Sequence, residues 1–292
     1  MERTYSREAT ERKFGIHGWI GITLALIFWA LNWSLEGLRT HWGFFPMWLG
    51  YTLTVDALVL YRTGTSLLTR SWAKFIGLFL ISAPAWWLFE AINVRTQNWV
   101  YLGAEQFTRW EYAFWATLNF SIVIPAVFGA AELMGSFKFV KNIKGGPVIR
   151  PDRRTTLIFF VTGWIMLALM IAWPLYFFPF VWLAVYFILE PLNIWLGNRS
   201  LAAYTKVGNW QPIVALWAGV LVTGFFWEMW NYFAYPKWIY QIPFVQVGHL
   251  FEMPLLGYGG YLPFALELFA LYHLLVGILG WKKTSYIKLE HH

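Results

Sequence analysis

The sequence predicts an all-α polytopic membrane protein with eight transmembrane helices, arranged as two parallel four-helix repeats. The chain is 59% hydrophobic and only 13% charged, and its mean hydropathy is +0.50, whereas a soluble domain is about 25% charged. Apolar runs of roughly 20 residues, the length that crosses a bilayer as a helix, recur from end to end. A series of similar short motifs, including intramembrane acids, also occurs twice along the chain in the same order. This indicates an internal repeat.

The apolar runs place the eight spans at residues 17–36, 44–61, 74–94, 112–135, 156–174, 177–196, 211–233 and 256–279. Most Lys and Arg residues fall at the chain ends and in loops on one side. The exceptions are Arg39, Arg95, Arg109 and Lys237. By the positive-inside rule, both termini are cytoplasmic. We therefore expect a multi-pass protein of the cytoplasmic (inner) membrane.

The two halves match at several positions. Matched pairs include Phe44-Phe45-Pro46 with Phe177-Phe178-Pro179, Asp56 with Glu190, and Ser66-Leu67 with Ser200-Leu201. Because each half has an even number of spans, both copies keep the same orientation, and a pseudo-twofold axis lies along the membrane normal. The predicted divisions are a first repeat at 1–136, a basic cytoplasmic linker at 137–155, a second repeat at 156–288 and an expression-tag remnant at 289–292.

Acidic residues inside the predicted spans are the main functional signal. No Lys or Arg lies well inside a span to pair with them, and each carboxylate near the bilayer centre costs roughly 2.5 kcal/mol or more. We expect these acids to be protonated, or to hold a cation or line a wet cavity between the halves. Six of the 15 acidic residues belong to this set: Asp56, Glu90, Glu132, Glu190, Glu228 and Glu267.

Two of these acids share a motif. Glu90 precedes Asn93 by three residues, as Glu228 precedes Asn231, so each acid and amide share a helix face. If the twofold axis holds, Glu90 and Glu228 approach each other, and one keeps a proton that it can donate. Asn93 and Asn231 would orient them. Alternatively, these helix-end acids simply hydrogen-bond to Trp and Asn neighbours or reach interfacial water.

Aromatic residues surround the paired acids. A Trp-x-Tyr segment follows each motif, as Trp99-Val100-Tyr101 and as Trp238-Ile239-Tyr240. Aromatic faces beside an acid stabilise a carbocation by cation–π attraction, although many of the 21 Trp belong to interfacial belts. Glu252 and Glu267 are predicted to act as base or cation stabiliser. The predicted substrate-binding residues, besides the two Asn, are Trp86, Trp87, Trp227, Trp230, Trp238 and Tyr240.

The stretch 254–263, which holds Pro254, Pro263 and three glycines, should interrupt the last span. Interrupted helices occur at membrane depth where the backbone lines a cavity. Close packing between helices is the alternative explanation.

This pattern resembles the integral-membrane lycopene cyclases of the heterodimeric or fused type. Each of their two modules has an acid at a span end, a Trp-rich connector and a Pro/Glu motif that opens the next span. In that family the Pro precedes an acidic pair, whereas here the order is reversed and a single acid is present. The resemblance implies redox-neutral cyclisation of a polyene end, started by protonation. The matching positions are Glu228, Trp238, Tyr240, Glu252 and Pro254, and in the first half Glu90, Trp99, Tyr101 and Glu111.

The sequence thus predicts an enzyme for acid-initiated cyclisation, hydration or isomerisation of a carotenoid-like or other isoprenoid lipid, without metal or cofactor. Zinc, P-loop and Asp-rich magnesium signatures are absent, and there is no cysteine. The expected partners are the hydrophobic substrate and membrane lipids, with no nucleic acid. The alternative is a proton- or ion-coupled transporter of a small or lipidic substrate. A haem protein is a third reading, with His17 and His273 as the one fitting pair, because His41 and His249 look like loop residues.

Overall fold

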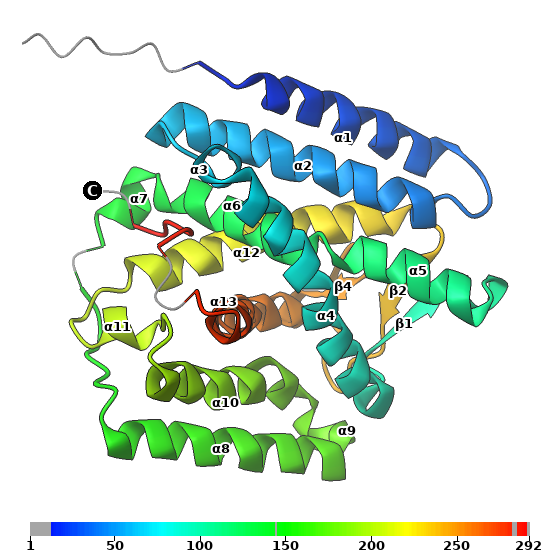
Figure 1. Ribbon diagram of the computed structural model, residues 1–292. Helices are drawn as coiled ribbons and strands as arrows, with labels where there is room; N and C mark the ends of the chain where they lie inside the picture. Colours follow the sequence, from blue (N-terminus) through cyan, green and yellow to red (C-terminus); the bar gives the residue numbers. More distant parts are fainter. Residues whose placement is uncertain (1–12, 144, 282–284, 291–292) are drawn as a thin grey trace, which may run out of the picture.

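The computed structural model describes residues 13–143, 145–281 and 285–290. Its long helices form a bundle, and the first and last described residues lie at one end, here called the terminal end (left in Figure 1). A two-stranded ribbon lies at the other, the ribbon end. Within the described residues, eight segments are long and apolar enough to cross a membrane, which confirms the predicted spans. They are Ile16–Ser34, Thr40–Thr63, Trp72–Thr96, Arg109–Gly135, Arg153–Ala172, Pro174–Leu196, Gln211–Tyr232 and Leu255–Ile278.

The first half contains α1 (Ile16–Ser34), α2 (Thr40–Thr63), α3 (Leu67–Arg70), α4 (Trp72–Thr96), β1 (Trp99–Leu102), the 3₁₀ turn η1 (Ala104–Gln106), α5 (Arg109–Phe120) and α6 (Val123–Gly135). After α7 (Lys138–Lys141), the second half contains α8 (Arg153–Ala172), α9 (Pro174–Phe177), η2 (Phe178–Phe180), α10 (Val181–Leu196), α11 (Ala202–Thr205), α12 (Gln211–Tyr232), β2 (Lys237–Tyr240), β3 (His249–Leu250), β4 (Met253–Pro254), η3 (Leu255–Gly260) and α13 (Tyr261–Ile278).

The helix pair α1–α2 forms one side of the bundle and the pair α8–α10 the other (Figure 1). Between them, α6 packs against α12 and α2, while α13 packs against α10, α12 and α4. Large fully buried side chains, such as Trp48, Phe128, Phe264 and Tyr272, fill this centre. The core is therefore rich in aromatic side chains, as expected for a chain in which 21% of the residues are aromatic.

Helices α6 and α12 approach each other closely. A Cβ added at Gly219 of α12 would lie 2.4 Å from the backbone nitrogen of Ala131 in α6. Glycine is required there because only the absence of a side chain allows two helices to approach so closely.

Two spans are interrupted. The span Arg109–Gly135 breaks between α5 and α6, where Ser82 Oγ of α4 donates to Phe120 O at 2.7 Å and accepts from Ile124 N at 3.0 Å. These bonds satisfy backbone groups that the break would otherwise leave without partners. The expected interruption of the last span at 254–263 is the 3₁₀ segment η3, which precedes α13 at the start of the span.

Matching hydrogen bonds recur in the two halves near the terminal end. Asp56 Oδ1 of α2 accepts from the backbone nitrogen of Leu68 at 3.0 Å, and Glu190 Oε1 of α10 accepts from that of Ala202 at 2.7 Å. Each acid thus binds the start of a short helix that lies 12 residues further along the chain. These two acids therefore fix the connections between successive spans at the terminal end, where α3 and α11 lie.

The expectation that the intramembrane acids lack cationic partners is wrong for Glu132. Its Oε1 pairs with Arg70 of α3 and also accepts from the backbone nitrogen of Lys288 at 2.7 Å. Asp56 lies 3.1 Å from His17 Nε2. Arg70 and Lys288 come from segments that flank the spans and fold back onto the helix ends, whereas His17 lies in the first turn of α1. Span positions alone do not reveal these contacts.

The C-terminal segment packs into the terminal end. Leu289 is fully buried, and Glu290 accepts a hydrogen bond from Asn209. The assignment of 289–292 to a tag remains a prediction, and these two packed residues do not favour it. His291 and His292 lie outside the described residues.

Candidate functional site

The two Trp-x-Tyr segments pair with each other at the ribbon end. Strands β1 and β2 are antiparallel, and their Cα partners are Trp99 with Tyr240, Val100 with Ile239, Tyr101 with Trp238 and Leu102 with Lys237. The register therefore exchanges the Trp of one half with the Tyr of the other, as a local twofold axis requires. Because alternate side chains of a strand share one face, the two Trp and two Tyr project from the same face of the ribbon.

The motif asparagines hold the strands rather than the acids. Asn93 Nδ2 donates to Trp99 O at 2.8 Å, and Asn93 Oδ1 accepts from the backbone nitrogens of Asn98 and Trp99. In the second half, Asn231 Nδ2 donates to Trp238 O at 2.7 Å and its Oδ1 accepts from Trp238 N at 3.0 Å. The prediction that these amides orient Glu90 and Glu228 is therefore wrong, because backbone groups use both ends of each amide.

Glu90 of α4 is bound by three aromatic donors. Its Oε1 accepts from Trp86 Nε1 at 2.8 Å, from Trp99 Nε1 at 3.0 Å and from the Tyr101 hydroxyl at 2.6 Å. One donor lies a helical turn earlier and the other two lie on β1. The Glu-x-x-Asn motif and the Trp-x-Tyr segment are thus one unit, in which Asn93 places the strand and the strand's side chains bind the acid.

Glu228 of α12 is fully buried and accepts from two tyrosines. Its Oε1 lies 2.7 Å from the Tyr240 hydroxyl and 2.6 Å from the Tyr261 hydroxyl, and Trp238 Nε1 donates to the Tyr240 oxygen at 3.0 Å. Its other oxygen, Oε2, is buried and has no hydrogen-bond partner among the described residues. An arrangement with two donors on one oxygen and none on the other suits a carboxyl group that carries its proton on Oε2.

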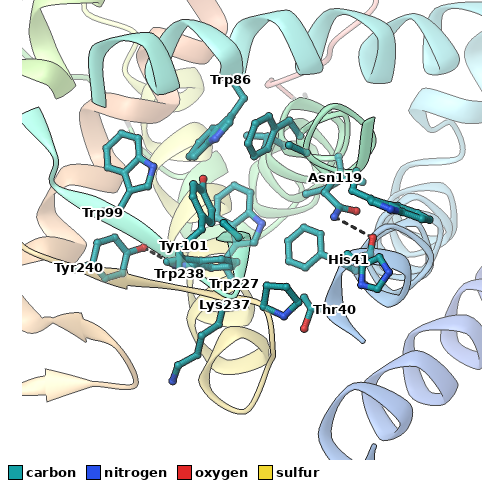
Figure 2. A pocket seen from close by; sticks show the side chains of 18 of the residues that line it. Thr40, His41, Trp86, Trp99, Tyr101, Asn119, Trp227, Lys237, Trp238 and Tyr240 are labelled. Carbon is teal, nitrogen blue, oxygen red and sulfur yellow. Dashed lines mark hydrogen bonds between the residues drawn. The ribbon is translucent and has the colours of Figure 1, made fainter. Parts of the chain in front are cut away.

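These aromatic side chains form part of the wall of a cavity of about 180 Å³ (Figure 2). Its floor and sides come from both halves of the chain, including α2, α4, α5, α12, α13 and both strands of the ribbon. Fourteen aromatic side chains line it: Phe44, Trp86, Trp99, Tyr101, Phe107, Tyr112, Trp115, Phe120, Trp182, Trp227, Trp238, Tyr240, Tyr261 and Phe264.

A second cavity of about 270 Å³ adjoins the first. It lies between Phe178 and Pro179 before α10 and the segment that carries Ile242, Val245 and Leu256. The two cavities share six wall residues, Trp99, Trp182, Tyr240, Met253, Gly257 and Gly260. Each alone is smaller than the roughly 300–1,000 Å³ of a typical ligand site, whereas the two together fall within that range.

Several predicted site residues border this chamber, and others lie elsewhere. Trp86, Trp227, Trp238 and Tyr240 line the first cavity. Trp87 is turned away and donates to Thr117 Oγ1 at 3.0 Å. Trp230 is buried against the rings of Trp29, Trp48, Tyr51 and Phe226. The assignment of Trp87 and Trp230 to the substrate site is therefore wrong, because their helix positions face neighbouring helices.

Two predicted catalytic acids lie outside the chamber. Glu252 pairs with Lys237 at the rim. Glu267 is fully buried within α13 and borders neither cavity. No hydrogen bond joins the carboxyl groups of Glu90 and Glu228 in the described part of the chain, and their expected approach stays a prediction. Each binds its own aromatic donors, and the paired strands connect the two sets.

The structure also adds residues that the sequence did not assign to this site. Tyr261 binds Glu228, and Trp182 separates the two cavities. His41, which the sequence placed in a loop, lies in the first turn of α2 and lines the first cavity together with Asn119 of α5. The repeated Trp-x-Tyr pattern had already marked Trp99 and Tyr101, which also line the first cavity. No pattern assigned Tyr261, Trp182, His41 or Asn119 to it, because each reaches the site from a different helix.

The ribbon tyrosines have perturbed acidity. Burial, followed by the nearby Glu90 carboxylate, raises the pKa of Tyr101 well above its ordinary value. Burial and then Glu228 raise the pKa of Tyr240 in the same direction. Both phenols therefore keep their protons at physiological pH and remain hydrogen-bond donors to the two acids.

The two histidines considered as haem ligands, His17 and His273, have partners within the protein. His17 Nε2 contacts Asp56 Oδ2 at 3.1 Å, and His273 Nδ1 lies 2.8 Å from Phe269 O. His249 lies in the exposed strand β3, away from His41. In the described residues, no group of three His, Cys, Asp or Glu side chains has a metal-binding arrangement.

The fold and the site define a class: a multi-pass α-helical membrane protein with an aromatic chamber at one end of the bundle, whose wall donates hydrogen bonds to two carboxyl groups. Comparisons with protein families, with curated proteins and with solved structures found no match.

Proposed function

We propose that this chain is an integral-membrane enzyme that catalyses acid-initiated, redox-neutral cyclisation of an isoprenoid lipid, or its hydration or isomerisation. The observation that supports this most directly is the combination of an apolar aromatic chamber with two acids behind its wall. Proton-initiated chemistry on a polyene needs an acid, a water-poor pocket and a means of stabilising a carbocation. The resemblance to lycopene cyclases points to the same reaction class.

In this proposal Glu228 supplies the proton through a tyrosine, because the carboxyl group itself does not border the cavity. Tyr240 or Tyr261, both hydrogen-bonded to Glu228 and both lining the cavity, passes its hydroxyl proton to a terminal carbon–carbon double bond of the substrate. The carboxyl group then turns so that its protonated oxygen faces the phenol, and the phenol oxygen takes up the carboxyl proton. The carboxylate left behind is stabilised by the hydroxyl groups that already point at Oε1.

The resulting carbocation is stabilised by the surrounding rings. Trp227 and Tyr261 are nearly parallel, with centroids 6.1 Å apart and an interplanar angle of 25°, and Trp86 lies edge-on to Phe264. Ring closure moves the positive charge to another carbon, and loss of a proton from a neighbouring carbon restores a double bond. In cyclisation or isomerisation the atoms of the substrate are thus conserved, while hydration adds one water.

Glu90 is the base that we favour for this last proton. It is reached through Tyr101, which lines the cavity and donates to Glu90 Oε1 at 2.6 Å. Of the two acids first expected in this role, Glu252 is paired with Lys237 and Glu267 borders neither cavity. The paired strands β1 and β2 then connect the proton-donating side of the site, at Glu228, to the proton-accepting side, at Glu90.

The alternative, a proton- or ion-coupled transporter, needs protonatable groups that connect the two membrane faces. Towards the terminal end, Asp56 and Glu190 accept backbone hydrogen bonds and Glu132 pairs with Arg70. These contacts suit structural roles. Uptake of protons or of a lipid by proteoliposomes carrying the purified protein would support the transporter instead.

The orientation follows from the distribution of basic residues and is part of the proposal. With the terminal end in the cytoplasm, the chamber lies near the opposite face of the inner membrane. Because the chain has no cysteine, a single cysteine placed at Glu105 or at Gly145 reports its side without background. An impermeant maleimide added to intact cells should label position 105 and spare position 145. The reverse result would invert the topology.

The proposed function is tested by identifying the lipid and following its conversion. Lipids that copurify with the protein are identified by mass spectrometry, and the reaction is followed by chromatography. An isomeric product indicates cyclisation or isomerisation, and a gain of one water indicates hydration. Glu228→Gln keeps the side-chain size but removes the acid, so the rate should fall by about 10²–10⁴-fold. Glu105→Gln, an exposed acid at the ribbon end, is the matched control. A parental rate in Glu228→Gln would refute the assignment.

A further inference from the structure

The side of the chamber away from Trp99 and Tyr240 carries two polar side chains with unused hydrogen-bonding atoms. His41 and Asn119 lie on one side of the cavity, while Trp99 and Tyr240 lie on the other, with Tyr101, Trp227 and Trp238 between them (Figure 2). His41 Nδ1 and Asn119 Oδ1 are both buried and have no hydrogen-bond partner among the described residues. Buried polar atoms are nearly always paired in native proteins, so each such atom requires an explanation.

The orientation of both side chains is set by their neighbours. Asn119 Nδ2 donates to His41 O at 3.2 Å, so the amide oxygen must be the unpaired atom, because a flipped amide would place two oxygens together. The His41 ring is held edge-on by Phe107, at a centroid distance of 5.1 Å, and by Trp115, at 4.9 Å. The two unpaired atoms therefore belong to ordered side chains on the cavity wall.

We propose that His41 and Asn119 bind the hydroxyl group of an elongated isoprenoid or polyene alcohol, whose chain crosses the aromatic chamber towards the second cavity. Asn119 Oδ1 can only accept, so the ligand must supply a donor there. We assign the ring proton of His41 to Nδ1, which then donates, so the ligand must also supply an acceptor. A hydroxyl provides both. A carbonyl or a carboxylate leaves Asn119 Oδ1 unpaired, and a hydrocarbon leaves both atoms unpaired.

This inference rests on the proposed function only in taking the chamber to be a lipid site, and it deepens that function by naming the substrate class. It predicts that the substrate carries an oxygen at one end while the reacting double bond lies near Tyr240 and Tyr261. The second cavity takes the remaining length of the chain past Trp182. The ligand's polarity would then decide which of its ends enters first.

The test uses two probes that differ only in the hydroxyl group: retinol and its 15-deoxy hydrocarbon. Both absorb where tryptophan emits, and six Trp residues line the first cavity, so energy transfer reports binding. Affinities are measured in detergent for the wild-type protein and for the variants His41→Phe and Asn119→Leu. For each probe, the affinity of a variant is compared with that of the wild-type protein, so that any effect of the detergent on the probe cancels. His249→Phe, which changes an exposed histidine outside both cavities, is the control.

Loss of the hydrogen bonds should weaken retinol binding by about 10-fold or more in each variant. Binding of the hydrocarbon should stay within about twofold, and His249→Phe should change neither affinity. If retinol and the hydrocarbon respond alike to His41→Phe and Asn119→Leu, the hydroxyl assignment is wrong while the lipid site stands. If neither probe binds the wild-type protein saturably, the lipid site and the proposed function both fail. Two independent variants, each checked for an unchanged unfolding temperature, guard against a misfolded protein.

Discussion

Trp99 and Tyr240 are Cα partners across the β1–β2 ribbon, and each donates a side-chain hydrogen bond to the acid of its own half of the chain. Trp99 binds Glu90 of α4, while Tyr240 binds Glu228 of α12. The ribbon therefore couples the two carboxyl groups through adjacent aromatic residues without bringing them into contact. The ribbon and its tyrosines, the contact between α6 and α12, and the cavities beside the ribbon lead to four predictions.

The first prediction concerns the pairing of the strands. The variant Val100→Cys/Ile239→Cys places two thiols on directly opposite residues of an otherwise cysteine-free chain. Mild oxidation should join them within the protein, because opposite residues of an antiparallel pair meet the Cα separation that a disulfide needs. A mobility shift on non-reducing gels and peptide mapping detect the bond.

The control is Leu102→Cys/Ile239→Cys, in which the thiols lie on the same face of the ribbon but two residues out of register. Diagonal neighbours are about 7–8 Å apart, which exceeds the usual disulfide range. Faster oxidation of this pair than of the 100/239 pair would contradict the register and the local twofold axis.

The second prediction concerns the tyrosine that binds the buried acid. Tyr240→Phe removes one donor to the neutral Glu228 carboxyl group and should lower the free energy of unfolding by about 0.5–1.5 kcal/mol near neutral pH. Burial and then Glu228 raise the pKa of Tyr240 in the folded protein. The stabilisation linked to its proton is therefore complete below the pKa of an unfolded tyrosine, near 10, and is lost as the pH rises above that value.

The difference in stability between the wild-type protein and Tyr240→Phe should thus be constant from about pH 7 to 9 and shrink above about pH 10. Chemical denaturation in detergent, followed across this range, measures it. Tyr61→Phe, which changes an exposed tyrosine on α2, is the control and should show neither effect. A difference that widens above pH 10 would contradict a phenol that stays protonated in the folded state.

The third prediction concerns the contact between α6 and α12. Gly219→Ala places a methyl group 2.4 Å from the backbone of Ala131, and because backbone cannot move aside as a side chain can, the helices must separate. We expect a loss of roughly 1–3 kcal/mol of unfolding free energy, as in other overpacked cores.

The matched control is Gly77→Ala in α4, where an added Cβ would meet no other group within 4 Å. Alanine is the better helix former, so this variant should be neutral or gain up to about 1 kcal/mol. Thermal unfolding in detergent compares the two. Equal stability of both variants would mean that the helices do not meet at Gly219.

The fourth prediction concerns the length of the ligand. A Cβ at Gly259 would meet no atom within 4 Å, and this residue lines the second cavity but not the first. Gly259→Leu should therefore fill the second cavity without disturbing the fold. Binding of a 20-carbon isoprenoid alcohol should weaken about 10-fold or more, while a 10-carbon alcohol, which fits in the first cavity, should bind as before.

Competition with retinol in the fluorescence assay measures both affinities. Gly77→Leu, a change of the same size outside both cavities, controls for bulk alone. If Gly259→Leu weakens the short and the long alcohol equally, the two cavities do not act as one extended site.

Much of the architecture could be predicted from the chain itself. Apolar run length is a local property, so the eight spans are where the sequence placed them. The repeated acid-x-x-Asn and Trp-x-Tyr patterns identified Glu90, Glu228, Trp238 and Tyr240 as neighbours of one site. Contacts within such a motif involve residues fewer than about 15 apart, and helix or strand geometry determines them.

The tertiary structure decided which side of each helix faces the chamber and which residues from other spans complete it. Trp86 lines the cavity and Trp87 does not, although they are adjacent, because successive residues of a helix point about 100° apart. His41, Asn119 and Tyr261 reach the site from three different spans. The sequence by itself determined the spans and the motif that binds each acid. Only the packing of helices distant in the chain produced the chamber, because helix rotation and close approach depend on every neighbouring side chain at once.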